Sequence, residues 1–467
     1  MHLAAAARPP AQVALSTGRA FHRSLTYHLC VSTTSAVGHD ARIPDPGQPE
    51  RASAASAPPA LAWRSWLAPI GIYLLIRAVG VLMLARFDAL RGSSLRDSLS
   101  AWDGKWMLAI AEHGYDGVPV ELTDARGYHT ADTAFAFFPG YPYTVGALAH
   151  LPFLSPFGAA VLLNLVLGCV AAVGTAQLGA LCVAWMAGRT PMVAALAHTD
   201  PGDSYARRVG LYLVAIFAAT PMSVVLNMAY TETLFCALSI WALVGVLQQR
   251  WVLAGICACL VGTVRPTAVV VIGVVMLAAL IDVFGRSGSG QEGSGRSGSG
   301  WTTAGAWLAL LLSPLGYLGY LAVVWAQTGS PTGWFTIQTQ GWDTRFDWGV
   351  AAFTFVNDQL VNSGEVAPVA TSWIIIATLV MVVVALWARL PWPVLTYGAL
   401  VTASIVASSG LMMSRPRLLL PAFVLLLPLA IVLARARPAI GVAVMVPIVL
   451  ASSWFGAHML TVYPHAM

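Results

Sequence analysis

The sequence predicts an all-α polytopic membrane protein. Of its 467 residues, 58% are apolar and only 10% are charged, and the mean hydropathy is +0.73. Several apolar runs, beginning at 66–84 and ending at 440–455, approach the roughly twenty residues that a helix needs to cross the bilayer. Because these runs are continuous and backbone polar groups must be satisfied inside lipid, helices are the expected spanning structures.

Charge and cysteine content exclude some alternatives. The net charge of +5 would suggest a nucleic-acid partner in a soluble protein, but the arginines lie mainly in short connections between apolar runs. That distribution is typical of membrane orientation, so no nucleic acid is expected. Five of the six cysteines lie inside apolar runs and are expected to pack there, which indicates no disulfide framework or zinc site. No metal-ligand spacing is present, so no cofactor is predicted.

The chain divides into a tail and a transmembrane domain. Residues 1–62 are rich in Ala, Pro and Ser without a continuous apolar core, which predicts a disordered cytoplasmic tail or a misassigned start rather than a signal peptide. The transmembrane domain covers 63–467. Within it, the Gly/Ser-rich segment 285–300 is expected to be a flexible cytoplasmic linker.

Two polar loops interrupt the apolar runs. The first, 87–133, holds eight of the twenty acidic residues of the chain. The second, 328–367, contains "WFTIQTQGWDTRFDWG" and is rich in Trp, Gln and Asp. These loops carry most of the polar side chains that a site outside the membrane would use.

The arginines predict the orientation of the spans. Placing the tail and Arg64 in the cytoplasm leaves the first polar loop outside. A simple alternation of full spans would then put four arginines in the middle of the chain outside as well. The positive-inside rule is satisfied if 135–186 crosses the membrane once and if 251–283 breaks at Pro266, which removes a backbone hydrogen bond.

This arrangement has ten to twelve membrane segments and gathers the polar sequences on the outer face. Both polar loops, residues 227–233, Arg265 and residues 413–417 then lie outside. The arginines expected inside are Arg189, Arg207, Arg208, Arg250, Arg286, Arg296, Arg389, Arg435 and Arg437.

The stretch "WDGKWMLAIAEHGYDG" predicts a short helix in the first loop. Its apolar side, formed by Trp102, Trp106, Ala109 and Ile110, is expected to lie on the membrane surface, and a glycine at 114 to end the helix. Asp103 is either an N-cap or a carboxylate at the water–lipid boundary that accepts a proton from a hydroxyl. Glu112 and His113, near the end of the helix, are more typical of solvated positions.

"FAFFPGYPY", residues 135–143, has two readings that the sequence leaves open. Five aromatic rings in nine residues are typical of an interfacial aromatic belt. Together with two prolines and a glycine, they also describe a rigid rim over which a lipid chain or a sugar slides.

Three further sites place charge at or near membrane depth. Glu232 in "AYTETLF" is either a first-turn residue behind a Thr231 cap or a functional carboxylate. Arg265 lies in an otherwise apolar run and needs an anionic partner, for which Glu232 or a phosphate would serve. Arg415 and Arg417 in "MMSRPR" are expected outside, where they contact either ordinary anionic head groups or a lipid-linked phosphate.

In order, "WDGKWMLAIAEHGY", "AFFPGYP", "AYTETLF", "RPTA" and "RPRLLLPAF" resemble the GPI mannosyltransferase 2 family, also called PIG-V-like, particularly its bacterial integral-membrane relatives. The resemblance spans most of residues 66–460, and its first two motifs are specific in combination. It implies a glycosyltransferase of the GT-C class, with a GT-C-like bundle whose extracytoplasmic loops carry the active site. Such an enzyme transfers a mannosyl residue from a polyprenyl-phosphate-linked donor to a glycolipid, lipoglycan or protein acceptor.

The resemblance assigns the catalytic base to Asp103. An inverting transfer needs one base for the incoming hydroxyl and positive charge for the leaving phosphate. Donor phosphate binding is therefore expected of Arg265, Arg415 and Arg417. Sugar or acceptor binding is expected of Trp102, Lys105, Glu112, Tyr141, Tyr230, Glu232 and Trp342.

Two other function classes compete with this hypothesis. A lipid-linked sugar flippase or transporter would also place arginines and acids in a polar cavity, but the sequence shows no internal repeat. A scaffold without activity would not need an arginine inside an apolar run. The Ala-rich, Lys-poor composition favours the plasma membrane of a bacterium, whereas a eukaryotic member would reside in the endoplasmic reticulum.

Overall fold

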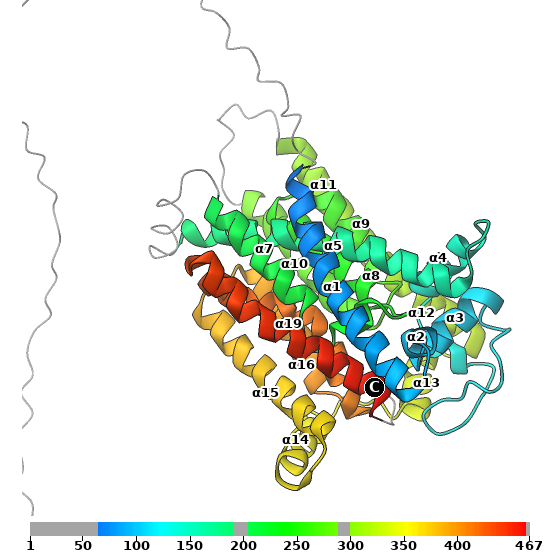
Figure 1. Cartoon of the computed structure of the whole chain (residues 1–467). Helices are drawn as coiled ribbons and strands as arrows, with labels where there is room; N and C mark the ends of the chain where they lie inside the picture. The colour runs from blue at the N-terminus through cyan, green and yellow to red at the C-terminus, as the bar shows by residue number, and fades with distance from the viewer. Residues whose placement is uncertain (1–63, 190–203, 288–298, 464–467) are drawn as a thin grey trace, which may run out of the picture. The chain divides into compact units, whose positions relative to one another are not determined.

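The computed structural model describes residues 64–189, 204–287 and 299–463. Within these ranges the chain is helical apart from its turns and one isolated antiparallel bridge between Phe346 and Ser408 (Figure 1). The predicted all-α fold is therefore confirmed. The predicted tail, 1–62, lies outside the described residues, as does most of the linker predicted at 285–300, whose two ends belong to helices.

The helices of the first half are α1 (Arg64–Arg91), α2 (Leu95–Leu99), α3 (Asp103–His113), η1 (Thr133–Ala136), α4 (Gly140–Ala149), α5 (Pro156–Ala187), α7 (Ser204–Ala218), η2 (Ser223–Leu226), α8 (Glu232–Leu247) and α9 (Trp251–Val261). Those of the second half are α10 (Ala268–Ser287), α11 (Ser299–Leu312), α12 (Leu315–Thr328), α13 (Gly333–Gly341), α14 (Val350–Asn362), α15 (Val366–Trp387), α16 (Trp392–Val406), η3 (Met412–Ser414), α17 (Arg415–Leu418), η4 (Leu420–Leu426), α18 (Leu427–Arg435) and α19 (Pro438–Thr461).

Helix length and composition make this a multi-pass integral membrane protein. In the described part of the chain, six helices are long and apolar enough to cross a membrane, or seven if the pair 412–418 and 420–435, bent by 55°, forms one span. The apolar helices α8, α9 and α16 are shorter. At about 1.5 Å per residue, α9 is only about 17 Å long, well short of a hydrocarbon core of about 30 Å. Full-length spans are therefore fewer than the ten to twelve expected, because the chain divides several apolar runs into short helices.

The predicted break at Pro266 is confirmed. Helix α9 ends at Val261 and α10 begins at Ala268. The break also holds α4, because the backbone N–H of Gly140 donates to the Thr263 carbonyl oxygen at 2.7 Å. A Cβ at position 140 would lie 2.8 Å from that oxygen, so the close approach requires glycine.

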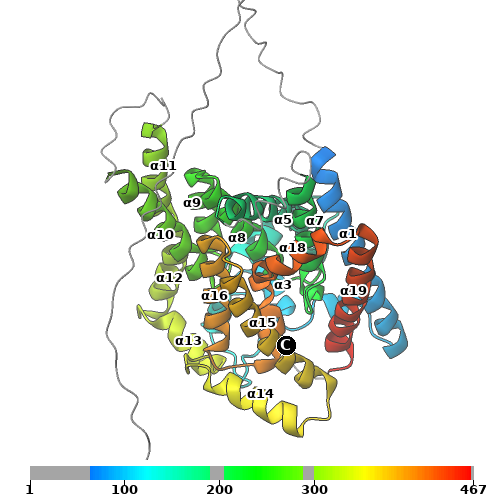
Figure 2. The ribbon, with the colours of Figure 1, turned by 90° about the vertical axis from the view of Figure 1, so that its left-hand side faces the viewer.

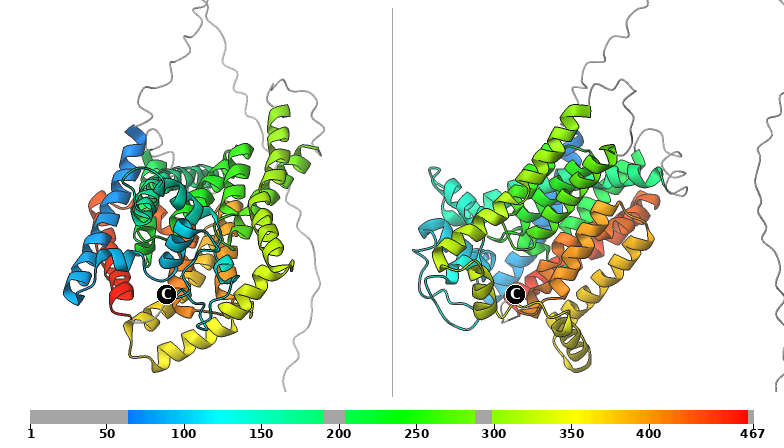
Figure 3. Two further views of the ribbon diagram at one scale, coloured as in Figure 1. Left: turned by 90° about the vertical axis from the view of Figure 1, so that its right-hand side faces the viewer. Right: turned by 180° about the vertical axis from the view of Figure 1, so that it is seen from behind.

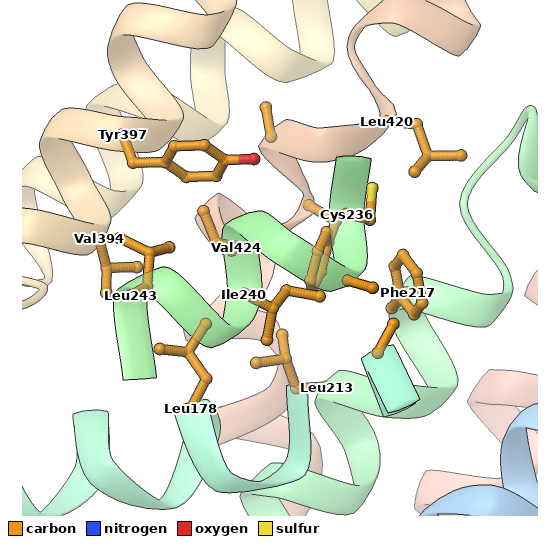
Figure 4. Close-up of a cluster of buried hydrophobic side chains, with 14 of the residues drawn as sticks. Leu178, Leu213, Phe217, Cys236, Ile240, Leu243, Val394, Tyr397, Leu420 and Val424 are labelled. Carbon is orange, nitrogen blue, oxygen red and sulfur yellow. The ribbon is translucent and has the colours of Figure 1, made fainter. Parts of the chain in front are cut away.

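Helix α8 lies in the middle of the hydrophobic core, against α5 and α9 (Figure 2). Figure 4 shows its side chains meeting those of the neighbouring helices. Helices α5 and α7 approach closely through small residues, since a Cβ on Gly179 would lie 2.9 Å from the Cα of Gly210. The cluster drawn in Figure 4 includes Leu178, Leu213, Phe217, Cys236, Ile240, Leu243, Val394, Tyr397, Leu420 and Val424.

The two polar loops meet at one end of the helices (Figure 3). The side-chain amide of Gln338 donates to the Ala136 carbonyl at 3.0 Å, and Arg126 lies 3.6 Å from Asp343. Sequences more than 200 residues apart therefore form a common layer, which includes α3 and α13. This contact agrees with the expectation that both loops lie on the same side.

Candidate active site

Asp103 and Arg417 form an ion pair in this layer. Asp103 is the first residue of α3, and Arg417 lies in α17 inside the bent helix pair. Nη1 of Arg417 is 2.7 Å from Oδ2 of Asp103, and the exposed fractions of the two side chains are 8% and 35%. The arginine is therefore buried, while the carboxylate is accessible from outside. One carboxylate oxygen is engaged by a charge-assisted hydrogen bond.

The backbone before Asp103 differs from the predicted cap. Trp102, not Asp103, occupies the N-cap position, and it makes no capping hydrogen bond. Its φ of 54° lies in the left-handed region, which costs a non-glycine residue about 1–3 kcal/mol and is often found at functional sites. Of the two roles that the sequence leaves open for Asp103, the structure rules out the N-cap, because the side chain turns to Arg417 instead. The predicted end at Gly114, with φ of 72°, is confirmed.

The apolar side of α3 packs inside the protein rather than on a membrane surface. Trp106 and Ile110 are buried against Val118 and Ala134, and the Trp106 ring lies 5.1 Å from that of Phe137. The loop after the helix folds back over this side and removes it from contact with lipid. The expectation of a membrane-surface helix is therefore wrong.

Tyr230 lies against the Asp103–Arg417 pair. The guanidinium carbon of Arg417 is 5.0 Å from the centre of the Tyr230 ring, within the range of a cation–π contact. A Cβ at Gly104 would lie 3.4 Å from Cε1 of Tyr230, which shows how closely the start of α3 approaches the ring. The backbone of Ala229 fixes this contact by donating to the Leu99 carbonyl at 2.9 Å.

Burial raises the pKa of the Tyr230 hydroxyl well above its ordinary value of 10.0. Asp103 and Glu232 raise this pKa further, whereas Arg417 lowers it. The phenol therefore stays protonated and can donate a hydrogen bond.

Glu232 and Arg265 form a second, more deeply buried pair. Oε1 of Glu232 lies 3.3 Å from Nη1 of Arg265, and the side chains are 2% and 12% exposed. The predicted partner of Arg265 is therefore present. The two groups lie at ion-pair distance, but Nη1 of Arg265 makes no hydrogen bond. Thr231 holds the predicted cap position but makes no side-chain capping bond, so Glu232 in the first turn is free to face the arginine.

Arg415 is separate from these pairs. Its guanidinium donates to the carbonyl oxygens of Ser408 and Ser409 and to the hydroxyl of Ser408. Ser408 is also the residue that bridges to Phe346 in the second polar loop. In this structure Arg415 therefore anchors the loop, and only Arg417 of the "RPR" pair reaches Asp103.

The other predicted sugar-binding residues lie around the pairs at different depths. Trp102 is partly buried, and its indole N–H has no hydrogen-bond partner. Tyr141 is fully buried, and its hydroxyl accepts from Asn164 at 3.0 Å, so it faces the interior. Lys105 and Glu112 are exposed on α3.

Trp342 contacts the opposite side of α3. Its ring lies 6.2 Å from that of Trp106 and 5.7 Å from that of Phe137. The structure thus brings Asp103, Arg417, Tyr230, Glu232 and Arg265 together and leaves Arg415, Lys105, Glu112 and Trp342 outside the cluster.

Sequence reasoning missed two residues that hold the cluster in place. Arg77, buried in α1, donates to the Ala218 carbonyl at 2.7 Å and to Ser223 and Asn227, and so fixes the segment that leads to Tyr230. An arginine in the middle of the run "YLLIRAVG" is the same signal that identified Arg265. Asn164 of α5 donates to the Met228 carbonyl and to Tyr141, and no pattern in the sequence singles it out.

In the part of the chain that the structure describes, no group of three or more His, Cys, Asp or Glu side chains is arranged to hold a metal ion. The chemistry available in the cluster is that of carboxylates, guanidiniums and a phenol.

Comparisons with known proteins are limited. No family model matches the chain, and no curated protein matches it. A solved structure that it resembles is the crystal structure of ArnT from Cupriavidus metallidurans bound to undecaprenyl phosphate. The match has 13% sequence identity and a TM-score of 0.44 and covers 86% of this chain and 76% of that chain. The resemblance to the PIG-V-like family stays a prediction.

Proposed function

We propose that this protein is a GT-C-class membrane glycosyltransferase. It would transfer a mannosyl residue from a polyprenyl-phosphate-mannose donor to an extracytoplasmic glycolipid, lipoglycan or protein acceptor, with inversion. The observation that carries the proposal is the Asp103–Arg417 pair, in which a solvent-accessible carboxylate lies 2.7 Å from a buried guanidinium. A group that can accept a proton and a group that can bind a phosphate therefore sit side by side.

The transfer would proceed by one displacement at the anomeric carbon of the donor sugar. The acceptor hydroxyl oxygen attacks this carbon while its proton passes to the carboxylate of Asp103. The bond between the anomeric carbon and the phosphate oxygen breaks, and its electron pair leaves with the polyprenyl phosphate. The transition state resembles an oxocarbenium ion. The configuration inverts because the acceptor attacks the face opposite the leaving phosphate.

The arginines would stabilise the charge that develops on the leaving phosphate. Arg417 is pre-positioned by Asp103 and by the Tyr230 ring. Arg265 carries the second guanidinium, which Glu232 orients at 3.3 Å. Preorganised donors of this kind act strongly because the site need not reorganise during the reaction. Arg415 would contribute indirectly, by holding the loop at Ser408.

Two further groups are suited to the sugar. The unpartnered indole N–H of Trp102 and the protonated hydroxyl of Tyr230 are donors next to Asp103. Sugar hydroxyls would satisfy them, which would offset the cost of leaving buried donors without a partner. The proposed location is the plasma membrane of a bacterium, with the cluster on the outer face.

Substitution of the proposed base tests the function directly. Purified protein in detergent micelles is given labelled polyprenyl-phosphate-mannose and candidate acceptors, and the glycosylated product is measured. Asp103→Asn and Asp103→Ala should abolish transfer while the proteins still insert and elute as folded particles. Glu121→Gln, which removes an exposed carboxylate from the same loop, should leave transfer unchanged. Transfer by Asp103→Asn near the parent rate would refute the assignment.

The same experiment separates the enzyme from a flippase. A flippase would form no new glycoside in detergent, because no second compartment exists there. A labelled product in detergent therefore supports the transferase. Its absence with every donor and acceptor, combined with donor translocation in liposomes, would replace the proposal.

A further inference from the structure

A cavity lies at the end of α3 opposite Asp103. Its volume is about 680 Å³, and it opens between the last residues of α3, helix α4 and helix α12. Phe135, Pro139 and Tyr143, which belong to the aromatic rim predicted at 135–143, form part of its wall. Part of the predicted aromatic rim therefore faces this cavity.

Aromatic rings line this cavity in a fixed arrangement. Tyr115 stacks on Phe135 with 4.4 Å between ring centres, and Tyr143 meets Tyr115 edge-on at 5.8 Å. The hydroxyl of Tyr115 donates to the Phe137 carbonyl at 2.7 Å, which locks the ring. Tyr143 is 53% exposed. The exposed ring of Tyr143 is thus available to a ligand, and the stacked rings of Tyr115 and Phe135 support it from below.

Polar side chains share the wall with these rings. Asp116, His113 and Gln327 are exposed, and each lines the cavity. The carboxylate of Asp116 accepts hydrogen bonds, and the imidazole of His113 and the amide of Gln327 can both accept and donate them. An aromatic ring can contact the C–H groups of a sugar, and the polar side chains can form hydrogen bonds with its hydroxyls. A site that has both is suited to binding a sugar ring.

Another cavity of the protein shows what a lipid site would look like. It has about 540 Å³ between α1, α7, α18 and α19, and its wall is almost entirely aliphatic. An acyl or isoprenoid chain fits such a wall. The cavity at α4 and α12 has carboxylate, imidazole and amide groups that a hydrocarbon chain would leave without partners.

The cavity lies about one helix length from the proposed base. Helix α3 has 11 residues, which corresponds to about 15 Å between Asp103 and the cavity end. We propose that this cavity binds the sugar residues of the acceptor that are remote from the reacting hydroxyl. The inference rests on the proposed function for its role in transfer, but the binding itself does not depend on catalysis.

Helix α12 offers a way to block the cavity without removing a contact. Gly319 lines it, and a Cβ built there meets nothing within 4 Å. Gly319→Leu therefore places a side chain in open space and should fold normally. Gly273→Leu on α10 is the matched control, since Gly273 also has open space and does not line this cavity.

The experiment measures binding and transfer separately. The probes are octyl glycosides that carry one or three manno-, gluco- or galacto-configured sugars, and binding to protein in nanodiscs is followed by isothermal titration calorimetry. We expect at least one trisaccharide to bind more than tenfold more tightly than its monosaccharide. Gly319→Leu, Tyr143→Ala and Asp116→Asn should each remove most of that difference, whereas Gly273→Leu should retain it.

The outcomes distinguish this proposal from the proposed function. If the trisaccharide preference is absent, or if Gly319→Leu and Tyr143→Ala both keep it, the cavity is not a glycan site. If binding behaves as expected but Asp103→Asn still transfers sugar, the catalytic assignment fails and the cavity assignment stands. If both hold, Gly319→Leu should raise KM for the trisaccharide acceptor and leave KM for the donor unchanged.

Discussion

Removing one partner of the buried Glu232–Arg265 ion pair should lower the free energy of unfolding more than removing both. At 3.3 Å and an effective dielectric constant of about 20, the two charges attract each other by about 5 kcal/mol. Much of this attraction offsets the cost of desolvating both groups. In Glu232→Gln, however, Arg265 stays buried without a counter-charge, and the expected loss is about 3–5 kcal/mol.

The assay is equilibrium unfolding in mixed micelles, followed by tryptophan fluorescence. A loss of about 3 kcal/mol lowers the folding equilibrium constant by more than a hundredfold. The double variant Glu232→Leu/Arg265→Met should recover most of the stability, because no isolated charge remains in the interior. Its transfer activity should nevertheless be lost if Arg265 binds the donor phosphate.

Two results would refute this reasoning. Glu232→Gln with unchanged stability would show that Arg265 finds another partner or reaches water. A double variant with parental transfer activity would show that the pair has a structural role alone. The coupling between the matching single variants Glu232→Leu and Arg265→Met distinguishes these cases, since substitutions of residues in direct contact are not additive.

Three further predictions concern Arg417, Tyr230 and Arg77. Arg417→Lys should lower kcat/KM about 10- to 100-fold in the transfer assay, because lysine cannot reproduce the planar contacts to both Asp103 and the Tyr230 ring. An unchanged kcat/KM would exclude Arg417 from phosphate binding. Above pH 10 the unfolded chain ionises Tyr230 while the folded chain keeps it protonated, so stability should fall by about 1.4 kcal/mol per pH unit for this group. Tyr230→Phe should reduce that slope in unfolding titrations between pH 10 and 11, and an identical slope would contradict the raised pKa. Arg77→Met should remove the hydrogen bonds to the Ala218 carbonyl, Ser223 and Asn227 and cost about 2–4 kcal/mol. Arg77→Lys, which keeps a donor, should lose less, and equal losses would show that the hydrogen bonds contribute nothing.

The sequence predicted the fold class and the break at Pro266 because both follow from local chemistry. Apolar content and run length determine whether a helix can span, and a proline inside an apolar run removes a backbone hydrogen bond and so favours a kink or a break there. It also predicted that Arg265 needs an anionic partner and named Glu232 or a phosphate, since an arginine at membrane depth requires a counter-charge. The structure confirms this pairing at 3.3 Å.

Properties that depend on distant parts of the chain could not be predicted. Local pattern made Asp103 a cap and put the apolar side of α3 on the membrane, but residues 118 and 134 cover that side and Arg417, 314 positions away, takes the carboxylate. The roles of Arg415 and Arg417 looked alike in "RPR" and differ because only one faces Asp103. Side-chain direction in a short, bent segment is decided by its neighbours rather than by its own sequence.

The charged cluster is built where helices are interrupted, and this follows from the membrane environment. Asp103 and Glu232 begin helices, Arg265 lies between α9 and α10, and Arg417 lies in the bent pair. Inside a bilayer, backbone without helical hydrogen bonds is tolerated only where protein or a polar cavity surrounds it. Each interruption therefore needs polar partners, and four interruptions that meet can supply them to one another. Shifting a break along the chain, for example by Pro266→Ala, should thus disturb the Glu232–Arg265 pair even though neither charged residue is replaced.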